Sequence, residues 1–187
     1  MSRPNFGHFK LTIGPMFAGK TTETLAEIER YMIAGRQCIL VKYSKDTRFD
    51  AESGSDKIMT HSGRIFDKCE IISSDDLAKV PTDNVDVIGV TEIQFYKNVV
   101  ESIKNWRSAG KTIIADGLNG DFKQEPFSVI SNLIPYVNDL MAVKAVCGIC
   151  KDINTANFSK RISDEDEKVV IGGADKYVAV CANCLYR

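Results

Sequence analysis

The sequence predicts an α/β fold with a parallel sheet, followed by a small C-terminal lobe. Short apolar runs at residues 10–14, 38–43, 85–90 and 111–116 are β-branched and lack a polar alternation, as is typical of strands buried on both faces. Amphipathic stretches separate these runs, and strands that alternate with helices form parallel sheets with right-handed crossovers. From Val143 onward the chain holds only short strand-like runs and two pairs of cysteines.

Two helices and one long loop are predicted between the strands. Leu25, Ile28 and Met32 recur at helical spacing before Gly35, which predicts a helix over 21–34. A second helix is predicted over 95–109, before Gly110. Residues 44–64 are polar and rich in Gly and Ser, which predicts a loop with a short hairpin near Ile58. We place the domain boundary so that 1–142 form the α/β domain and 143–187 the small lobe.

The composition excludes several classes of protein. The 187 residues are 44% hydrophobic and 26% charged, the balance of a soluble globular domain. The 24 basic and 25 acidic residues give a net charge of −1, without the basic excess that non-specific nucleic-acid binding needs. No apolar run approaches the roughly 18 residues of a membrane span, and the first residues lack the apolar core of a signal peptide. We therefore expect a cytoplasmic location, with neither a membrane nor a nucleic acid as partner.

The strongest motif is Gly14-Pro-Met-Phe-Ala-Gly19-Lys20-Thr21, which fits G-x-x-x-x-G-K-[ST]. It follows a predicted strand and opens a predicted helix, which is the context that a phosphate-binding P-loop requires. The backbone N–H groups of such a loop and the helix N-terminus hold a β-phosphate. We expect Lys20 to bridge the β- and γ-phosphates of a nucleotide and the Thr21 hydroxyl to bind Mg²⁺.

A candidate acidic group follows another strand. The run at 85–90 leads into Thr91-Glu92-Ile93-Gln94, so Glu92 lies just past the carboxyl end of a buried strand, where α/β folds bind their ligands. Glu92 is a candidate general base for an acceptor hydroxyl, and the alternative is a solvated loop glutamate. Asp86, at the start of the same strand, is expected to face solvent.

Four of the six cysteines form the pairs Cys147-x-x-Cys150 and Cys181-x-x-Cys184. Each pair presents two thiolates, and two pairs complete the tetrahedral shell of a structural zinc site. The alternative is a dithiol redox centre, which the absence of a thioredoxin-like context disfavours. Cys38 lies in an apolar run and is expected to be a buried hydrophobe.

In combination, the motifs resemble one family. GPMFAGKT (14–21), KYSKDTR (42–48), TEIQF (91–95), GLNGDFKQEPF (117–127), SKR (159–161) and IGGADKY (171–177) occur in order with the two cysteine pairs. Over Leu11 to Tyr186, the chain resembles the type II thymidine kinases of vertebrate cytosol, poxviruses and many bacteria. The resemblance implies a P-loop α/β domain, a zinc lobe, and a "lasso" loop that covers the nucleoside.

The resemblance also implies the residues of the site. Glu92 matches the catalytic base. The implied ATP-binding residues are Gly14, Pro15, Met16, Phe17, Ala18, Gly19, Lys20, Thr21, Asp46, Thr47, Arg48, Thr91 and Gln94. The implied thymidine-binding residues are Met16, Phe95, Leu118, Phe122, Phe127, Ser159, Lys168, Val169, Val170, Ile171, Gly172 and Tyr177, of which Met16, Leu118 and Ser159 match positions that pack against the thymine methyl. ATP with Mg²⁺, a structural Zn²⁺ at the four cysteines, thymidine as substrate and a homotetramer are implied as well.

Two residues depart from the family pattern. The family usually has Asp-Glu where this chain has Thr91-Glu92, and that aspartate acts on Mg²⁺ directly or through water, whereas threonine brings no charge. Lys168 stands where an apolar residue is commoner. We expect an active thymidine kinase; the alternatives are a nucleotide-binding relative with little activity and a zinc-ribbon nucleic-acid module joined to a P-loop ATPase.

Overall fold

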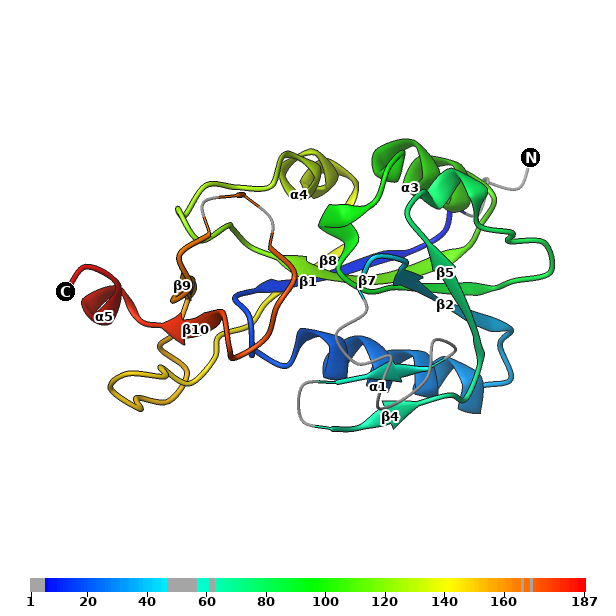
Figure 1. Cartoon of the computed structure of the whole chain (residues 1–187). Coiled ribbons are helices and arrows are strands. Elements are labelled where there is room, and N and C mark those ends of the chain that lie inside the picture. The colour runs from blue at the N-terminus through cyan, green and yellow to red at the C-terminus, as the bar shows by residue number, and fades with distance from the viewer. Residues whose placement is uncertain (1–5, 47–56, 61–62, 166, 169) are drawn as a thin grey trace.

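A six-stranded parallel sheet forms the centre of the structure (Figure 1). The computed structural model describes residues 6–46, 57–60, 63–165, 167–168 and 170–187. The strands lie in the order β5-β2-β6-β7-β1-β8, and each neighbouring pair is parallel. Their bounds are Phe9–Gly14 (β1), Cys38–Tyr43 (β2), Glu70–Ser74 (β5), Val87–Val90 (β6), Thr112–Leu118 (β7) and Asp139–Ala142 (β8). The predicted α/β fold with a parallel sheet is confirmed.

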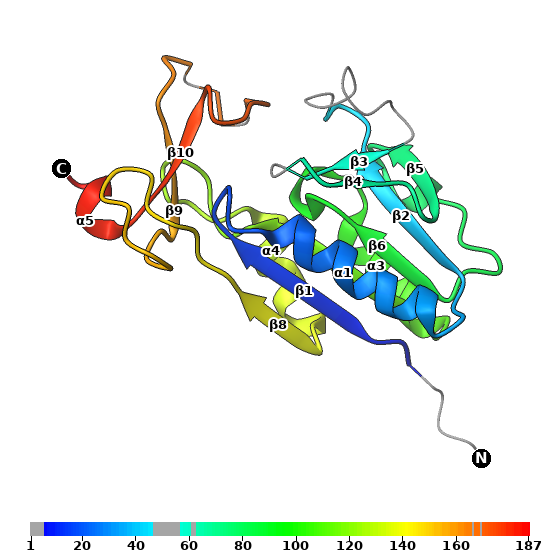
Figure 2. The same cartoon turned by 90° about the horizontal axis from the view of Figure 1, so that it is seen from below.

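Helices cover both faces of the sheet. Helix α1 (Lys20–Ile33) lies on one face, and α3 (Val99–Ser108) and α4 (Ser128–Leu133) lie on the other (Figures 1 and 2). Alternate residues of β7 pack against the helices on opposite faces of the sheet. Ile114 packs with Leu25 and Ile28 of α1, whereas Ile113 packs in the cluster that contains Ile103 of α3. This burial on both faces explains the continuous apolar runs of the central strands. Within the described ranges, no helix is both long and apolar enough to cross a bilayer.

Most predicted elements agree with the structure to within a few residues, and the differences have local causes. The second helix was predicted from residue 95 but begins at Val99, because Ile93–Phe95 form a 3₁₀ turn (η2) and Asn98 adopts a left-handed conformation with φ 55°. The hairpin near Ile58 is confirmed, since β3 (Ile58–Met59) pairs antiparallel with β4 (Ile65–Phe66). Among the described strands and α-helices of the α/β domain, the edge strands β5 and β8, which are half-exposed and partly polar, and the short helix α4 were not predicted.

Two further 3₁₀ turns, η1 (Leu77–Lys79) and η3 (Ile134–Tyr136), follow β5 and α4. Asp76 caps η1 by accepting the N–H of Ala78 at 3.0 Å. Asp86 is exposed at the entry to β6, as expected, whereas Cys38 is only partly buried.

The C-terminal lobe lies at the carboxyl end of β1. It contains the antiparallel pair β9 (Phe158–Arg161) and β10 (Tyr177–Val180) and the short helix α5 (Ala182–Leu185), which Figure 1 shows apart from the six-stranded sheet. Its small core gathers around the cysteines, and Phe17 and Ala18 of the phosphate loop pack against it. The Met16 N–H also donates to Ser159 Oγ at 2.9 Å, so the lobe contacts the phosphate loop directly.

Candidate active site

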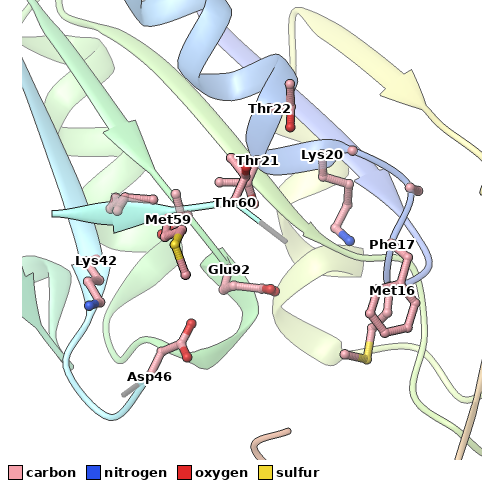
Figure 3. Close-up of a pocket in the computed structure, with 14 residues that line it drawn as sticks. Met16, Phe17, Lys20, Thr21, Thr22, Lys42, Asp46, Met59, Thr60 and Glu92 are labelled. Atoms are coloured by element: carbon pink, nitrogen blue, oxygen red, sulfur yellow. The ribbon is translucent and has the colours of Figure 1, made fainter. Parts of the chain in front are cut away.

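The loop between β1 and α1 borders a polar pocket of about 220 Å³ (Figure 3). Gly19 caps α1 with φ 77°, a left-handed conformation that glycine adopts without strain. The first turn of α1 thus opens into the pocket with its unsatisfied N–H groups, an arrangement that binds phosphate. The pocket is lined by Met16, Phe17, Ala18, Gly19, Lys20, Thr21, Thr22, Lys42, Asp46, Ile58, Met59, Thr60, Thr91 and Glu92.

Lys20, the first residue of α1, is buried with 6% of its surface exposed. Its Nζ donates to the carbonyl oxygen of Pro15 at 2.8 Å, which keeps the ammonium within the loop. Figure 3 shows the Lys20 and Glu92 side chains reaching into the pocket from different elements. A cation held inside a loop of backbone N–H groups provides strong electrostatic attraction for an anion, and this is the property that a phosphate site needs.

Glu92 follows β6 in a left-handed conformation, φ 51° and ψ 49°, that a residue with a side chain rarely adopts. Its N–H donates to Asp116 Oδ1 at 3.1 Å. Its Oε2 accepts from Gln94 Nε2 at 2.8 Å, and Gln94 Oε1 accepts the N–H of Leu118 at 3.1 Å. Backbone and side chain of Glu92 are therefore each fixed by a neighbour.

Asp116 lies within β7 and is fully buried. Burial raises its pKa to about 7, and the negative charge of Glu92 adds to the rise, while Lys20 opposes it. Asp116 ends the predicted strand run 111–116 and was not among the predicted site residues, although it was considered, with Asp46, as a carboxylate that could serve Mg²⁺ in place of residue 91. The signal that could have found it is the presence of a carboxylate in a strand predicted to be buried on both faces, where aspartate is rare.

A second, more apolar pocket adjoins the first and shares Met16, Asp46 and Glu92 with it. One wall is a row of aromatic rings: Tyr43 and Phe95 have centroids 5.4 Å apart, and Phe95 and Phe127 6.0 Å. Flat rings with a few polar groups suit a planar aromatic ligand. The rest of the lining is Leu118, Gly120, Asp121, Phe122, Ser159, Lys168, Val170, Ile171, Gly172 and Tyr177.

The described residues of the predicted lasso, Lys168 and 170–172 with Tyr177, line this second pocket. Tyr177 Oη donates to the carbonyl of Val170 at 2.9 Å and accepts from Arg161 Nη2 at 2.7 Å. The Arg161 guanidinium lies 3.8 Å from the centroid of the Phe122 ring. Lys168 Nζ lies 3.2 Å from Asp121 Oδ2. Contacts from both ends thus hold the lasso over the pocket.

The structure brings most of the predicted site residues into these two adjoining pockets. Gly14 and Pro15 do not line either pocket, and Gln94 contacts the site through its hydrogen bond to Glu92. Thr47, Arg48 and Val169 lie outside the described residues. Lys42 and Tyr43 were not predicted but carried a signal, since they end a buried strand where ligands collect. The other lining residues that were not predicted are Thr22, Ile58, Met59, Thr60, Gly120 and Asp121.

The four paired cysteines of the C-terminal lobe converge. The Sγ atoms of Cys147, Cys150, Cys181 and Cys184 all lie within 4.8 Å of one another, and those of Cys150 and Cys181 are 3.8 Å apart. Tetrahedral coordination with Zn–S bonds of about 2.3 Å puts the sulfurs about 3.8 Å apart. The Cys181 N–H donates to Cys147 Sγ at 3.4 Å, a contact typical of a thiolate ligand. The donor set and its spacing fit zinc.

Comparison with known proteins agrees with this geometry. The family model of thymidine kinase matches residues 7–185. The thymidine kinase of Myxoma virus (strain Lausanne) is 40% identical over 181 residues, covering 96% of this chain and 97% of the viral protein. Thymidine kinase 1 of Dictyostelium discoideum is 38% identical over 180 residues, 95% of this chain and 77% of that protein.

A solved structure, the flagellar accessory protein FlaH from Methanocaldococcus jannaschii, aligns with a TM-score of 0.50 at 15% identity. The alignment covers 74% of this chain and 71% of FlaH, and at this identity it shows a shared fold only. The match to the family model and the two relatives extends over nearly the whole length: the chain belongs to the thymidine kinase family.

Proposed function

We propose that the chain transfers the γ-phosphoryl group of ATP to the 5′-hydroxyl of thymidine, and of deoxyuridine, which yields dTMP for nucleotide salvage. One observation carries this proposal: Glu92 lines both the phosphate pocket and the adjoining apolar pocket. The Glu92 carboxylate, together with that of Asp46, therefore faces the junction at which a nucleoside hydroxyl would meet a nucleotide phosphate. The relatives named thymidine kinase support the choice of substrate.

Glu92 acts as the general base in this proposal. A nucleoside hydroxyl is a poor nucleophile at neutral pH, and a positioned carboxylate can take its proton as the bond to phosphorus forms. The hydrogen bonds from Gln94 to the side chain and from the Glu92 N–H to Asp116 hold the carboxylate in place. Positioning matters here because phosphoryl transfer depends mainly on alignment and charge stabilisation.

The phosphate loop binds ATP in this proposal. Its backbone N–H groups and the first turn of α1 hold the phosphates, and Lys20 stabilises the charge that develops on the transferred group. Residues at this end of the sheet also suit Mg²⁺, which prefers oxygen ligands and keeps several waters. The Thr21 hydroxyl and the Asp46 carboxylate line the pocket, and Asp116 Oδ2 is a buried oxygen with no hydrogen-bond partner among the described residues. When bound, Mg²⁺ neutralises charge on the phosphate oxygens.

The apolar pocket binds the nucleoside in this proposal. The rings of Phe95 and Phe127 offer a wall for the base, and Met16, Leu118 and Ser159 contribute to the lining beside it. Ser159 Oγ accepts the Met16 N–H, which fixes both residues. Phe122 adds to the wall of the pocket. The remaining predicted contacts come from the lasso, which excludes water from the transferred group, and they are Lys168, Val170, Ile171, Gly172 and Tyr177.

We further propose a structural zinc at the four cysteines, a domain boundary between residues 142 and 143, and a homotetramer. The boundary is supported by β8, which ends at Ala142 in the large sheet, and by Ala145, which already packs in the core of the small lobe. Light scattering of the purified protein tests the tetramer.

The decisive experiment compares Glu92→Gln with the wild type in single-turnover phosphoryl transfer and in equilibrium thymidine binding. Glutamine keeps the size but takes no proton, so we expect the rate to fall by about 10²–10⁴-fold with thymidine affinity largely kept. Glu101→Gln, on the exposed face of α3, is the matched control. A wild-type chemical rate in Glu92→Gln would remove Glu92 from the mechanism. Nucleotide binding without thymidine turnover in the wild type would contradict the proposed function itself.

A further inference from the structure

Three buried polar atoms lie between α1 and the sheet with no hydrogen-bond partner among the described residues. They are Thr12 Oγ1, Thr24 Oγ1 and Asp116 Oδ2. Thr12 and Asp116 are direct neighbours on the adjacent parallel strands β1 and β7, and Thr24 is a buried residue of α1, which packs on both strands. Buried polar groups are almost always paired, and Thr24 is close enough to Asp116 to lower the pKa of its carboxyl group, so the carboxylate lies among polar side chains without a short hydrogen bond from the described residues to its Oδ2.

Asp116 is the one carboxylate of the cluster, and it lies beneath the phosphate loop. The charge of Lys20, at the loop's end, stabilises its ionised form, and the charge of Glu92 opposes ionisation. Both effects require Asp116 to be close to the two charged side chains that the mechanism uses. A buried carboxylate without full pairing destabilises the fold, and an apolar residue at this position of β7 would avoid that cost, so a purely structural role does not explain Asp116.

Asp116 also hydrogen-bonds to the backbone of Glu92, the proposed general base. Its Oδ1 accepts the Glu92 N–H at 3.1 Å, and Glu92 is held in the left-handed region at φ 51°. Strained residues of this kind persist only where the surroundings fix them. Thr91, the preceding residue, is buried, and its Oγ1 lies 3.4 Å from the carbonyl oxygen of Val41, so it adds no charge and directs its hydroxyl at the backbone.

We propose that Asp116 is a positioning residue of the phosphoryl transfer that supplies, from β7, the second acidic group that position 91 lacks. Its Oδ1 fixes the Glu92 backbone, and its charge orients the water shell of Mg²⁺ from beneath the phosphate loop. This inference rests on the proposed function for its effect on turnover, whereas its effect on the metal concerns the enzyme–nucleotide complex alone.

The experiment removes the carboxylate at position 116 in β7 and places one at position 91, directly after β6. Asp116→Asn keeps an oxygen for the Glu92 N–H but removes the charge, and Asp116→Asn with Thr91→Asp restores an acidic group at the neighbouring position. The first readout is the affinity of Mn²⁺ for the enzyme–ADP complex, measured by electron paramagnetic resonance without thymidine. The second readout is kcat and KM for thymidine.

We expect Asp116→Asn to weaken Mn²⁺ binding by about tenfold and to lower kcat by at least about tenfold, with KM for thymidine changed less than about threefold. The double variant with Thr91→Asp should recover most of both losses, and the double variant with Thr91→Asn should recover neither. Unchanged Mn²⁺ affinity in Asp116→Asn overturns the inference whatever happens to kcat, and so does equal behaviour of the two double variants.

Asp76→Asn is the matched control, since Asp76 is also buried but accepts the Ala78 N–H and the Asn98 amide, whereas Asp116 accepts the Glu92 N–H. It should lose stability, because it weakens a cap, and keep Mn²⁺ affinity and kcat. Asp116→Asn should keep or gain stability while it loses both functions. If the wild type fails to phosphorylate thymidine, the proposed function fails, but the Mn²⁺ measurement still decides the role of Asp116.

Discussion

Gln94 connects Glu92 to the nucleoside pocket, because its Nε2 donates to Glu92 Oε2 at 2.8 Å while its Oε1 accepts the N–H of Leu118 at 3.1 Å. The connection leaves little space: a Cβ at Gly117 would lie 2.8 Å from Gln94 Oε1. The orientation of the base and the position of one wall of the pocket are therefore set by the same amide group.

Replacing Gln94 by Leu should release the Glu92 carboxylate and leave the Leu118 N–H unpaired. We expect kcat to fall by about tenfold, the usual order for a lost orienting contact, with a smaller rise in KM for thymidine. Gln94→Glu keeps the shape but sets a second carboxylate against Glu92, so the acidic limb of the pH–rate profile should move to higher pH. Steady-state kinetics across pH check both outcomes, and a profile identical to the wild type in both variants would contradict the role.

Lys20→Ala should abolish phosphoryl transfer while the fold is kept. The ammonium is held inside the loop by Pro15 O, and loss of a preorganised donor from a phosphate site costs about 3–4 kcal/mol in transition-state stabilisation. Circular dichroism and thymidine binding confirm that the variant is folded. A kcat close to that of the wild type would show that this loop does not hold the reacting phosphate.

Removal of zinc should unfold the C-terminal lobe before the α/β domain. The four cysteines form the centre of the small core of the lobe, and structural zinc contributes directly to folding. Serine at Cys147, which is fully buried, should remove the metal and lower the melting temperature, whereas serine at the partly exposed Cys69 should do neither. Metal analysis that finds no zinc in the wild type would refute the site.

The ion pair of Lys168 and Asp121 should make lasso closure sensitive to salt. The Asp121 side chain is almost fully buried, whereas that of Lys168 is half-exposed, so the pair is expected to contribute about 1 kcal/mol. Lys168→Met should raise KM for thymidine by about two- to fivefold at low salt and less at high salt, because screening already weakens the pair there. A double-mutant cycle with Asp121→Asn measures the coupling energy between Lys168 and Asp121. Additive effects of the two substitutions on KM for thymidine would show that the ion pair does not stabilise the closed lasso.

Asp116 should make the stability of the nucleotide-free protein fall as pH rises. Its pKa is raised to about 7 in the folded state, against about 3.9 in the unfolded chain. Between these values the folded state binds more protons than the unfolded state, so unfolding free energy decreases from about pH 4 to about pH 7.

Asp116→Asn should therefore flatten the dependence of the melting temperature on pH in this window. Asp76 should have the opposite effect on the pH dependence of stability, because its pKa is lowered, chiefly by a hydrogen bond from Asn98. Asp76→Asn should therefore remove stability that is present above about pH 4. Thermal unfolding of the two variants from pH 4 to 8 distinguishes these opposite effects on the pH dependence of stability. An unchanged pH dependence in Asp116→Asn would show that this carboxyl is ionised in both states.

Local sequence patterns predicted the parts of the fold that depend on short-range physics. The runs that became β1, β2, β6 and β7 are apolar because both faces are covered, and the phosphate loop is specified by Gly19 and the helix behind it. The edge strand β8 escaped prediction because its Leu140 is half-exposed and only pairing with β1 orders it. The position of Asp116 relative to Lys20 and Glu92 could not be predicted from local patterns, since it depends on the register of β7 against β1 and β6.

The hydrogen bond that the Met16 N–H donates to Ser159 Oγ links the phosphate loop to β9 of the C-terminal lobe, so the stabilities of the two segments are thermodynamically coupled. A ligand that orders the phosphate loop should also stabilise β9. In the same way, a metal that orders the lobe containing β9 should also stabilise the loop. Such coupling is reciprocal in free energy. Nucleotide binding should therefore raise the equilibrium affinity for zinc by the same factor by which zinc raises the affinity for nucleotide. A metal far from the reaction would then be an allosteric partner of the phosphate donor.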